Sequence, residues 1–136
     1  MATFKQRQFS EEEKDLFLHF LGLLTGYLNR CKNLHWAASK NNIHVRLDEL
    51  HGIMSSYQDA LAEGYMGILG KMGPLDVRAI GCGIGEPVAF IKDVLEKTSE
   101  FYERIPGAAI FKGISSDCES FIQNLNKYKY LFELCV

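Results

Sequence analysis

Apolar residues recur at steps of three and four along most of this chain, which is the spacing of one face of an α-helix. The first such segment begins at residues 10–13, which have the S-x-x-E form of a capping box, and runs to about Ser39. The second follows Asn41 and Asn42, which can cap it, and ends within residues 70–74. These two segments predict a pair of long helices joined by a short turn.

Two further helices are predicted in the second half of the chain. One starts near Glu86 and Pro87 and stops before Pro106, and the other takes Ser115 or Ser116 as its N-cap and runs to the end. Glycines at 81, 83 and 85 mark a flexible connector between the pairs, long enough to cross the molecule. No strand alternation or repeat competes with this pattern. We therefore expect a single all-α domain over residues 1–136, folded as a ferritin-like four-helix bundle.

Composition narrows the class of protein further. The chain has 136 residues, of which 47% are hydrophobic, and its net charge of −2 gives no electrostatic argument for nucleic-acid binding. No apolar run reaches the roughly 18 residues of a membrane span. The four cysteines, at 31, 82, 118 and 135, are widely spaced, and reduced thiols are a better interpretation than disulfides or zinc ligands. This favours a cytoplasmic location.

The candidate chemistry lies between residues 34 and 64. His44 and Asp48 are four residues apart, and so are Asp59 and Glu63, so all four fall within an arc of about 100° on the second helix. Asp48 and Asp59 are about 16 Å apart along that helix, so one ion cannot reach both from one chain. The set is palindromic, however. Two antiparallel copies, related by a two-fold axis near residues 53 and 54, would bring His44 and Asp48 of one chain opposite Glu63 and Asp59 of the other.

A shared metal site explains this pattern better than a solvated helix face. Asp48 has no lysine or arginine four residues away, and Asp59 and Glu63 are four residues apart, so these acids would be repelled unless a cation offset their charge. Small residues at 52, 55 and 56 would let two helices approach closely at the proposed axis. Imidazole and carboxylate ligands suit iron, manganese or zinc better than calcium or magnesium, and the spacing does not choose among the three.

These residues carry a resemblance to a known family. Residues 33–36 (NLHW), residues 44–50 (HVRLDEL), and then Asp59 and Glu63 resemble the ferroxidase motif of the Dps family, the ferritin-like miniferritins called "DNA-binding protein from starved cells". The resemblance covers about 30 residues closely, and the order of helices extends it loosely over the chain. It implies a dodecameric shell that oxidises Fe(II) with hydrogen peroxide or oxygen, stores the ferric mineral and limits oxidative damage.

The resemblance also implies a role for each site residue. His35 would bind metal from the first helix, and the partner subunit would supply the acids that complete each site. Trp36 would lie beside the metal, where it would either quench radicals or fill the dimer contact. The implied ligands are His35, His44, Asp48, Asp59 and Glu63.

Three alternatives remain open at this point. His51, three residues after Asp48, resembles part of the di-iron motif of larger ferritins, but the third and fourth helices carry no histidine, so a site within one chain is disfavoured. His51 would then be an extra ligand or pack near the two-fold axis. The termini have no lysine-rich tail, which argues against DNA binding. Finally, the chain could be a ferritin-like structural or binding oligomer without ferroxidase activity.

Overall fold

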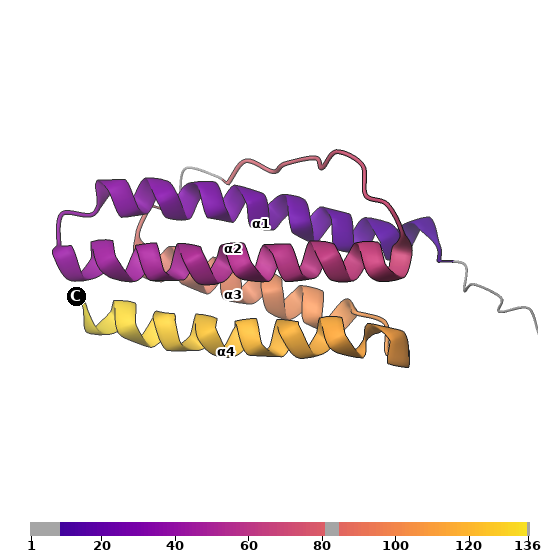
Figure 1. The fold of residues 1–136 in the computed structure, drawn as a ribbon. Coiled ribbons are helices and arrows are strands. Elements are labelled where there is room, and N and C mark those ends of the chain that lie inside the picture. The colour runs from indigo at the N-terminus through magenta and orange to yellow at the C-terminus, as the bar shows by residue number, and fades with distance from the viewer. Residues whose placement is uncertain (1–8, 81–84, 136) are drawn as a thin grey trace, which may run out of the picture.

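Four long helices make up the protein, whose computed structural model describes residues 9–80 and 85–135 (Figure 1). No strand occurs in these ranges, and a short 3-10 turn, η1, precedes the last helix. The prediction of an all-α four-helix bundle is confirmed. The elements are α1 (Glu11–Ala37), α2 (Asn41–Leu69), α3 (Pro87–Arg104), η1 (Ala109–Phe111) and α4 (Lys112–Leu134).

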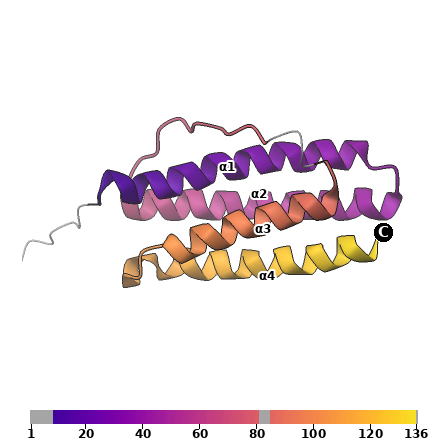
Figure 2. The same cartoon turned by 180° about the vertical axis from the view of Figure 1, so that it is seen from behind.

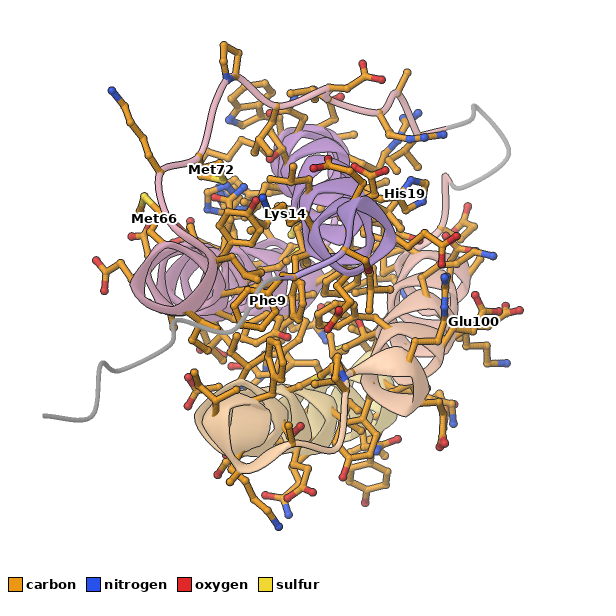
Figure 3. The ribbon with its side chains drawn as sticks, turned by 90° about the vertical axis from the view of Figure 1, so that its right-hand side faces the viewer. Phe9, Lys14, His19, Met66, Met72 and Glu100 are labelled. Atoms are coloured by element: carbon orange, nitrogen blue, oxygen red, sulfur yellow. The ribbon has the colours of Figure 1, made fainter. Side chains whose placement is uncertain are left out.

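The helices form two antiparallel hairpins, α1 with α2 and α3 with α4, as the sequence predicted (Figures 1 and 2). Between the hairpins, residues 70–80 run back along the outside of α1, so that α2 and α3 point in the same direction. Viewed from one end, the four helices surround a common core and this segment lies outside α1 (Figure 3). The connector therefore covers α1, and no other described segment lies over the outer face of α2.

Several helix ends follow from local chemistry. The backbone N–H of Glu13 donates to Ser10 Oγ at 3.1 Å, and the N–H of Ser10 donates to Glu13 Oε1 at 3.2 Å, which completes the capping box at the start of α1. Gly70 ends α2 with a φ of 96°, a left-handed conformation that favours glycine. Pro87 occupies the first turn of α3, where its missing N–H costs nothing.

Two predicted helix starts were wrong. The helix α4 begins at Lys112 rather than after a Ser115 or Ser116 cap, because Phe111 is fully buried and fixes the η1 turn just before it. Asn41 and Asn42 lie inside α2 instead of capping it, and the N-cap position is Lys40, which makes no side-chain cap. At the start of α4, the packing of Phe111 thus outweighs the local capping preference.

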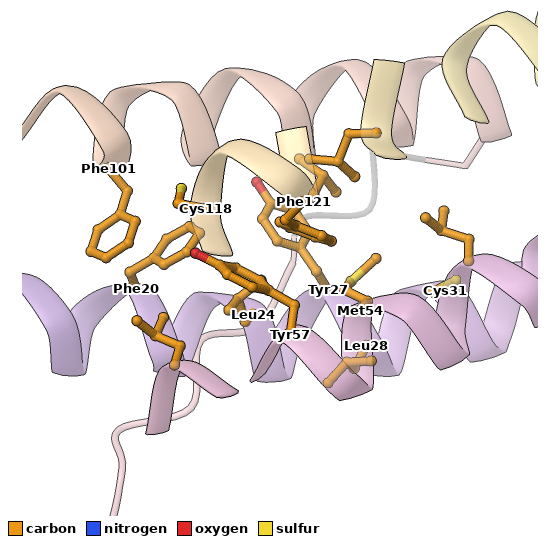
Figure 4. Close-up of a cluster of buried hydrophobic side chains, with 14 of the residues drawn as sticks. Phe20, Leu24, Tyr27, Leu28, Cys31, Met54, Tyr57, Phe101, Cys118 and Phe121 are labelled. Atoms are coloured by element: carbon orange, nitrogen blue, oxygen red, sulfur yellow. The ribbon is translucent and has the colours of Figure 1, made fainter. Parts of the chain in front are cut away.

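Aromatic side chains form much of the core (Figure 4). Phe20 of α1 stacks on Phe101 of α3 with ring centroids 4.1 Å apart, and Tyr57 of α2 stacks on Phe121 of α4 at 4.2 Å. Each stack joins helices from different hairpins. The two hairpins are thus held together by large buried rings, each of which removes much apolar surface from water.

The cysteines bear out the sequence interpretation in part. Cys31 and Cys118 are free and buried, while Cys135 is free and partly exposed. Burial raises the pKa of the Cys31 thiol to about 12 and that of Cys118 to about 11, which makes both thiols unreactive at neutral pH. Cys82 and most of the glycine-rich segment expected to be flexible lie outside the described residues. No helix in the described ranges is both long and apolar enough to cross a membrane.

Candidate metal centre

The turn between α1 and α2 brings two histidines face to face. His35 lies in the last turn of α1 and His44 in the first turn of α2, and their rings stack with centroids 3.8 Å apart and planes 21° apart. His35 Nδ1 lies 2.7 Å from the carbonyl oxygen of His44, and His44 Nδ1 lies 2.8 Å from the carbonyl oxygen of His35. The short linker between the helices makes this reciprocal contact possible.

This hydrogen bonding fixes which nitrogen of each ring is available. A carbonyl oxygen can only accept, so each Nδ1 must carry the proton that it donates. In the neutral ring the Nε2 atom then presents a lone pair. Metal-binding histidines are usually held in this way, with one ring nitrogen donating to a backbone oxygen or a carboxylate while the other binds the metal. Both His35 and His44 are therefore oriented as ligands would be.

Asp48 supplies a carboxylate beside this pair. Its Oδ1 atom lies 3.9 Å from His35 Nε2. Metal bonds to histidine nitrogen and carboxylate oxygen are each about 2 Å long, so a bound ion would require only a small rotation of Asp48. The Asp48 side chain is 62% exposed and that of His35 only 12%, so a fixed imidazole faces a carboxylate that is free to turn.

Lys32 was missed by the sequence interpretation, although it lies one helical turn before His35. Its Nζ atom is 3.8 Å from the same Asp48 Oδ1, so an ammonium group and an imidazole approach one oxygen. Asp48 was expected to lack a basic partner because only its own helix was considered. The lysine comes from the neighbouring helix, and its i,i+3 spacing from His35 was the available signal.

His51 also faces this cluster. Burial lowers its pKa, the positive charge of Lys32 and the His35 ring lower it further, and Asp48 opposes the shift. His51 is half-buried on α2, one turn after Asp48. An extra ligand role remains compatible with this position.

The other predicted site residues lie elsewhere. Asp59 and Glu63 are exposed on α2, about 16 Å and 22 Å beyond Asp48 along the helix, and the single chain does not bring them near the histidines. Over residues 9–80 and 85–135, no three histidine, cysteine or acidic side chains form a group that could hold a metal ion. Trp36 is 67% exposed next to the turn. Of the predicted ligands, the described part of one subunit thus brings together His35, His44 and Asp48 but not Asp59 or Glu63.

On another side of α2, Glu49 joins this helix to α4 through a hydrogen bond. Tyr128 Oη donates to Glu49 Oε2 at 2.9 Å, and Arg46 Nη1 approaches the same oxygen at 3.1 Å. These two donors hold the pKa of the Glu49 carboxyl below its ordinary value. Glu49 is thus committed to a structural contact, whereas the adjacent Asp48 points to the histidine cluster.

A groove of about 750 Å³ lies between α2 and α4. The stacked rings of Tyr57 and Phe121 contribute to its lining, and Gly52 and Ser56 lie at its α2 side. It contains none of the predicted metal ligands, and it is separate from the histidine cluster.

Comparisons with known proteins do not assign a family. No family model, no curated protein and no solved structure matches the chain.

Proposed function

We propose that this protein is a Dps-like miniferritin that binds Fe(II) as its substrate between two subunits, oxidises it and stores the ferric product. The observation that carries the proposal is the stacked histidine pair. Each ring donates from Nδ1 to the other residue's carbonyl and keeps Nε2 as a lone pair, with the Asp48 carboxylate 3.9 Å from one of them. This arrangement suits a divalent transition metal.

The partial ligand set is the reason for placing the site between subunits. Asp59 and Glu63 mirror His44 and Asp48 along α2, so an antiparallel copy of α2 would complete the site twice. The middle of this face is open at Gly52, where an added Cβ would meet no atom within 4 Å. Two α2 helices can therefore approach closely near the proposed axis.

The ligand chemistry fits iron oxidation. Imidazoles and carboxylates both bind Fe(II), and the carboxylates favour the harder Fe(III) product. Two Fe(II) ions give one electron each to hydrogen peroxide, which takes up two protons and becomes two waters. With oxygen as oxidant, two electrons and two protons yield hydrogen peroxide. Trp36, exposed beside the turn, would quench radicals or fill the contact between subunits. Manganese or zinc would fit the same ligands.

Fe(II) oxidation by the purified protein tests the proposal. We expect oxidation faster than in buffer, saturating near two irons per shared site and then continuing as a soluble mineral in a large shell. The substitution His44→Ala removes a proposed ligand and should reduce the rate of Fe(II) oxidation to that in buffer. The matched control is His19→Ala, which removes an exposed histidine of α1 that is remote from the turn. Equal rates in both variants would contradict the proposal.

The groove between α2 and α4 favours a second candidate, a ferritin-like binding or structural oligomer without ferroxidase activity. Its lining combines the stacked rings with polar side chains such as Ser56, Ser120 and Asn124, features of a site for a partner or ligand rather than for redox chemistry. Oxidation no faster than in buffer, in a small oligomer that still folds, would favour this candidate over the miniferritin.

A further inference from the structure

We propose that Lys32 is a built-in competitor for the cation at Asp48, so that a divalent ion enters the site only by displacing the lysine ammonium group. This inference rests on the proposed function, because it assumes that the histidine cluster binds a divalent metal. It adds a residue that would set the affinity of the site without being a ligand.

Two nitrogen atoms lie close to the same oxygen, Asp48 Oδ1. Lys32 and His35 lie one turn apart on α1, and their Nζ and Nε2 atoms approach Asp48 Oδ1 to 3.8 and 3.9 Å. A metal bound to both His35 Nε2 and Asp48 Oδ1 would share this carboxylate oxygen with the ammonium group of Lys32, which lies 3.8 Å from it. The ion and the ammonium cannot both neutralise this oxygen, because like charges a few ångströms apart repel.

Exposure makes displacement feasible. The side chains of Lys32 and Asp48 are 38% and 62% exposed, so the ammonium can turn into water, and such exposed ion pairs are weak. Lys32 therefore does not block the site but raises the metal concentration needed to fill it. In the absence of metal, the lysine pairs with Asp48, whose Oδ1 atom otherwise faces the His35 imidazole.

Affinity for Co²⁺, which stands in for Fe(II) without being oxidised and whose visible absorption changes when its ligands change, tests this inference by calorimetry and absorption. Lys32→Gln removes the charge and shortens the side chain by one atom, so we expect binding about five- to tenfold tighter, the scale of one partly exposed charge interaction. Lys32→Arg keeps the charge and should bind like the wild type. The control Lys97→Gln removes a lysine that pairs with Glu100 at 3.7 Å on α3 and should also change nothing.

The possible outcomes separate the inference from the proposed function. Unchanged or weaker Co²⁺ binding by Lys32→Gln, with clear binding by the wild type, would overturn the role of Lys32 and leave the metal site standing. Absence of Co²⁺ binding in every variant would overturn both. Tighter binding by Lys32→Gln, lost when His44→Ala is added, is the result that the inference requires.

Discussion

The contact between α1 and the connector makes Gly26 the residue whose substitution tests the fold most sharply. A Cβ added at Gly26 would lie 2.0 Å from the carbonyl oxygen of Arg78 and 3.2 Å from Cγ1 of Ile80. One turn earlier, a Cβ at Gly22 would lie 2.3 Å from the carbonyl oxygen of Asp76. The connector backbone therefore lies directly on the glycine face of α1.

Two hydrogen bonds hold the connector in this position. The N–H of Arg78 donates to the Gly22 carbonyl at 3.3 Å, and Arg30 Nη2 donates to the Ile80 carbonyl at 3.2 Å. In Gly26→Ala the Arg78 carbonyl must move outward by about 1.4 Å to reach the 3.4 Å at which ordinary contact begins. Such overpacking usually costs about 1–3 kcal/mol. The gain of about 1 kcal/mol in helix propensity offsets part of it, so we expect a net loss of about 1 kcal/mol.

Urea unfolding followed by circular dichroism measures this change. The matched control is Gly67→Ala in α2, where an added Cβ meets nothing within 4 Å. The control should stabilise the protein by about 0.5 kcal/mol, because alanine reduces the entropy of the unfolded chain. The two substitutions should therefore shift the urea midpoint in opposite directions. A Gly26→Ala protein as stable as the Gly67→Ala protein would refute the close contact between connector and helix.

Two other predictions concern the α2 surface and alkaline pH. Gly52→Arg should halve the mass of the smallest oligomer, measured by light scattering, without unfolding the subunit. Gly113→Arg, at a position of α4 that also faces open space, should leave this mass unchanged. Equal masses for the two variants would contradict pairing of subunits through α2. Burial raises the pKa of Cys31 to about 12 and of Cys118 to about 11, and burial with the hydrogen bond to Glu49 raises that of Tyr128 to about 12. In the unfolded chain the pKa values are 9.0 for cysteine and 10.0 for tyrosine, so the protonated groups stabilise the fold fully below these values. The free energy of unfolding, measured in urea, should therefore fall between about pH 9 and 12. A free energy of unfolding that stays constant over this range would count against the burial of these groups.

The helices could be predicted from the sequence because their apolar spacing agrees with their end signals. The Ser10 capping box and the stop at Gly70 are local features, and both are found where the sequence predicted them. The start of α4 could not be predicted in this way. The serines at 115 and 116 are good caps, but burial of Phe111 against Phe17, with ring centroids 5.6 Å apart, starts the helix earlier. That contact joins residues far apart in the chain.

The candidate site was only partly predictable for a similar reason. Helical spacing placed His44, Asp48, Asp59 and Glu63 along α2, and their separation in one chain agrees with the structure. The reciprocal bonds between the two histidines depend on the geometry of the turn, which no periodicity describes. The approach of a lysine from α1 to Asp48 depends likewise on how the two helices pack.

The central claim is that each iron site is shared by two subunits, and complementation between two inactive variants tests it most directly. His44→Ala and Asp59→Ala would remove ligands from opposite halves of the proposed site. Each variant alone should lack fast Fe(II) oxidation. In a mixed dimer, one site would lose both ligands and the other would be intact. Half of the dimers formed on refolding an equal mixture are mixed, so about one quarter of the wild-type number of sites should be restored. No recovery in a mixture shown to contain mixed dimers, or full activity in either variant alone, would contradict a shared site.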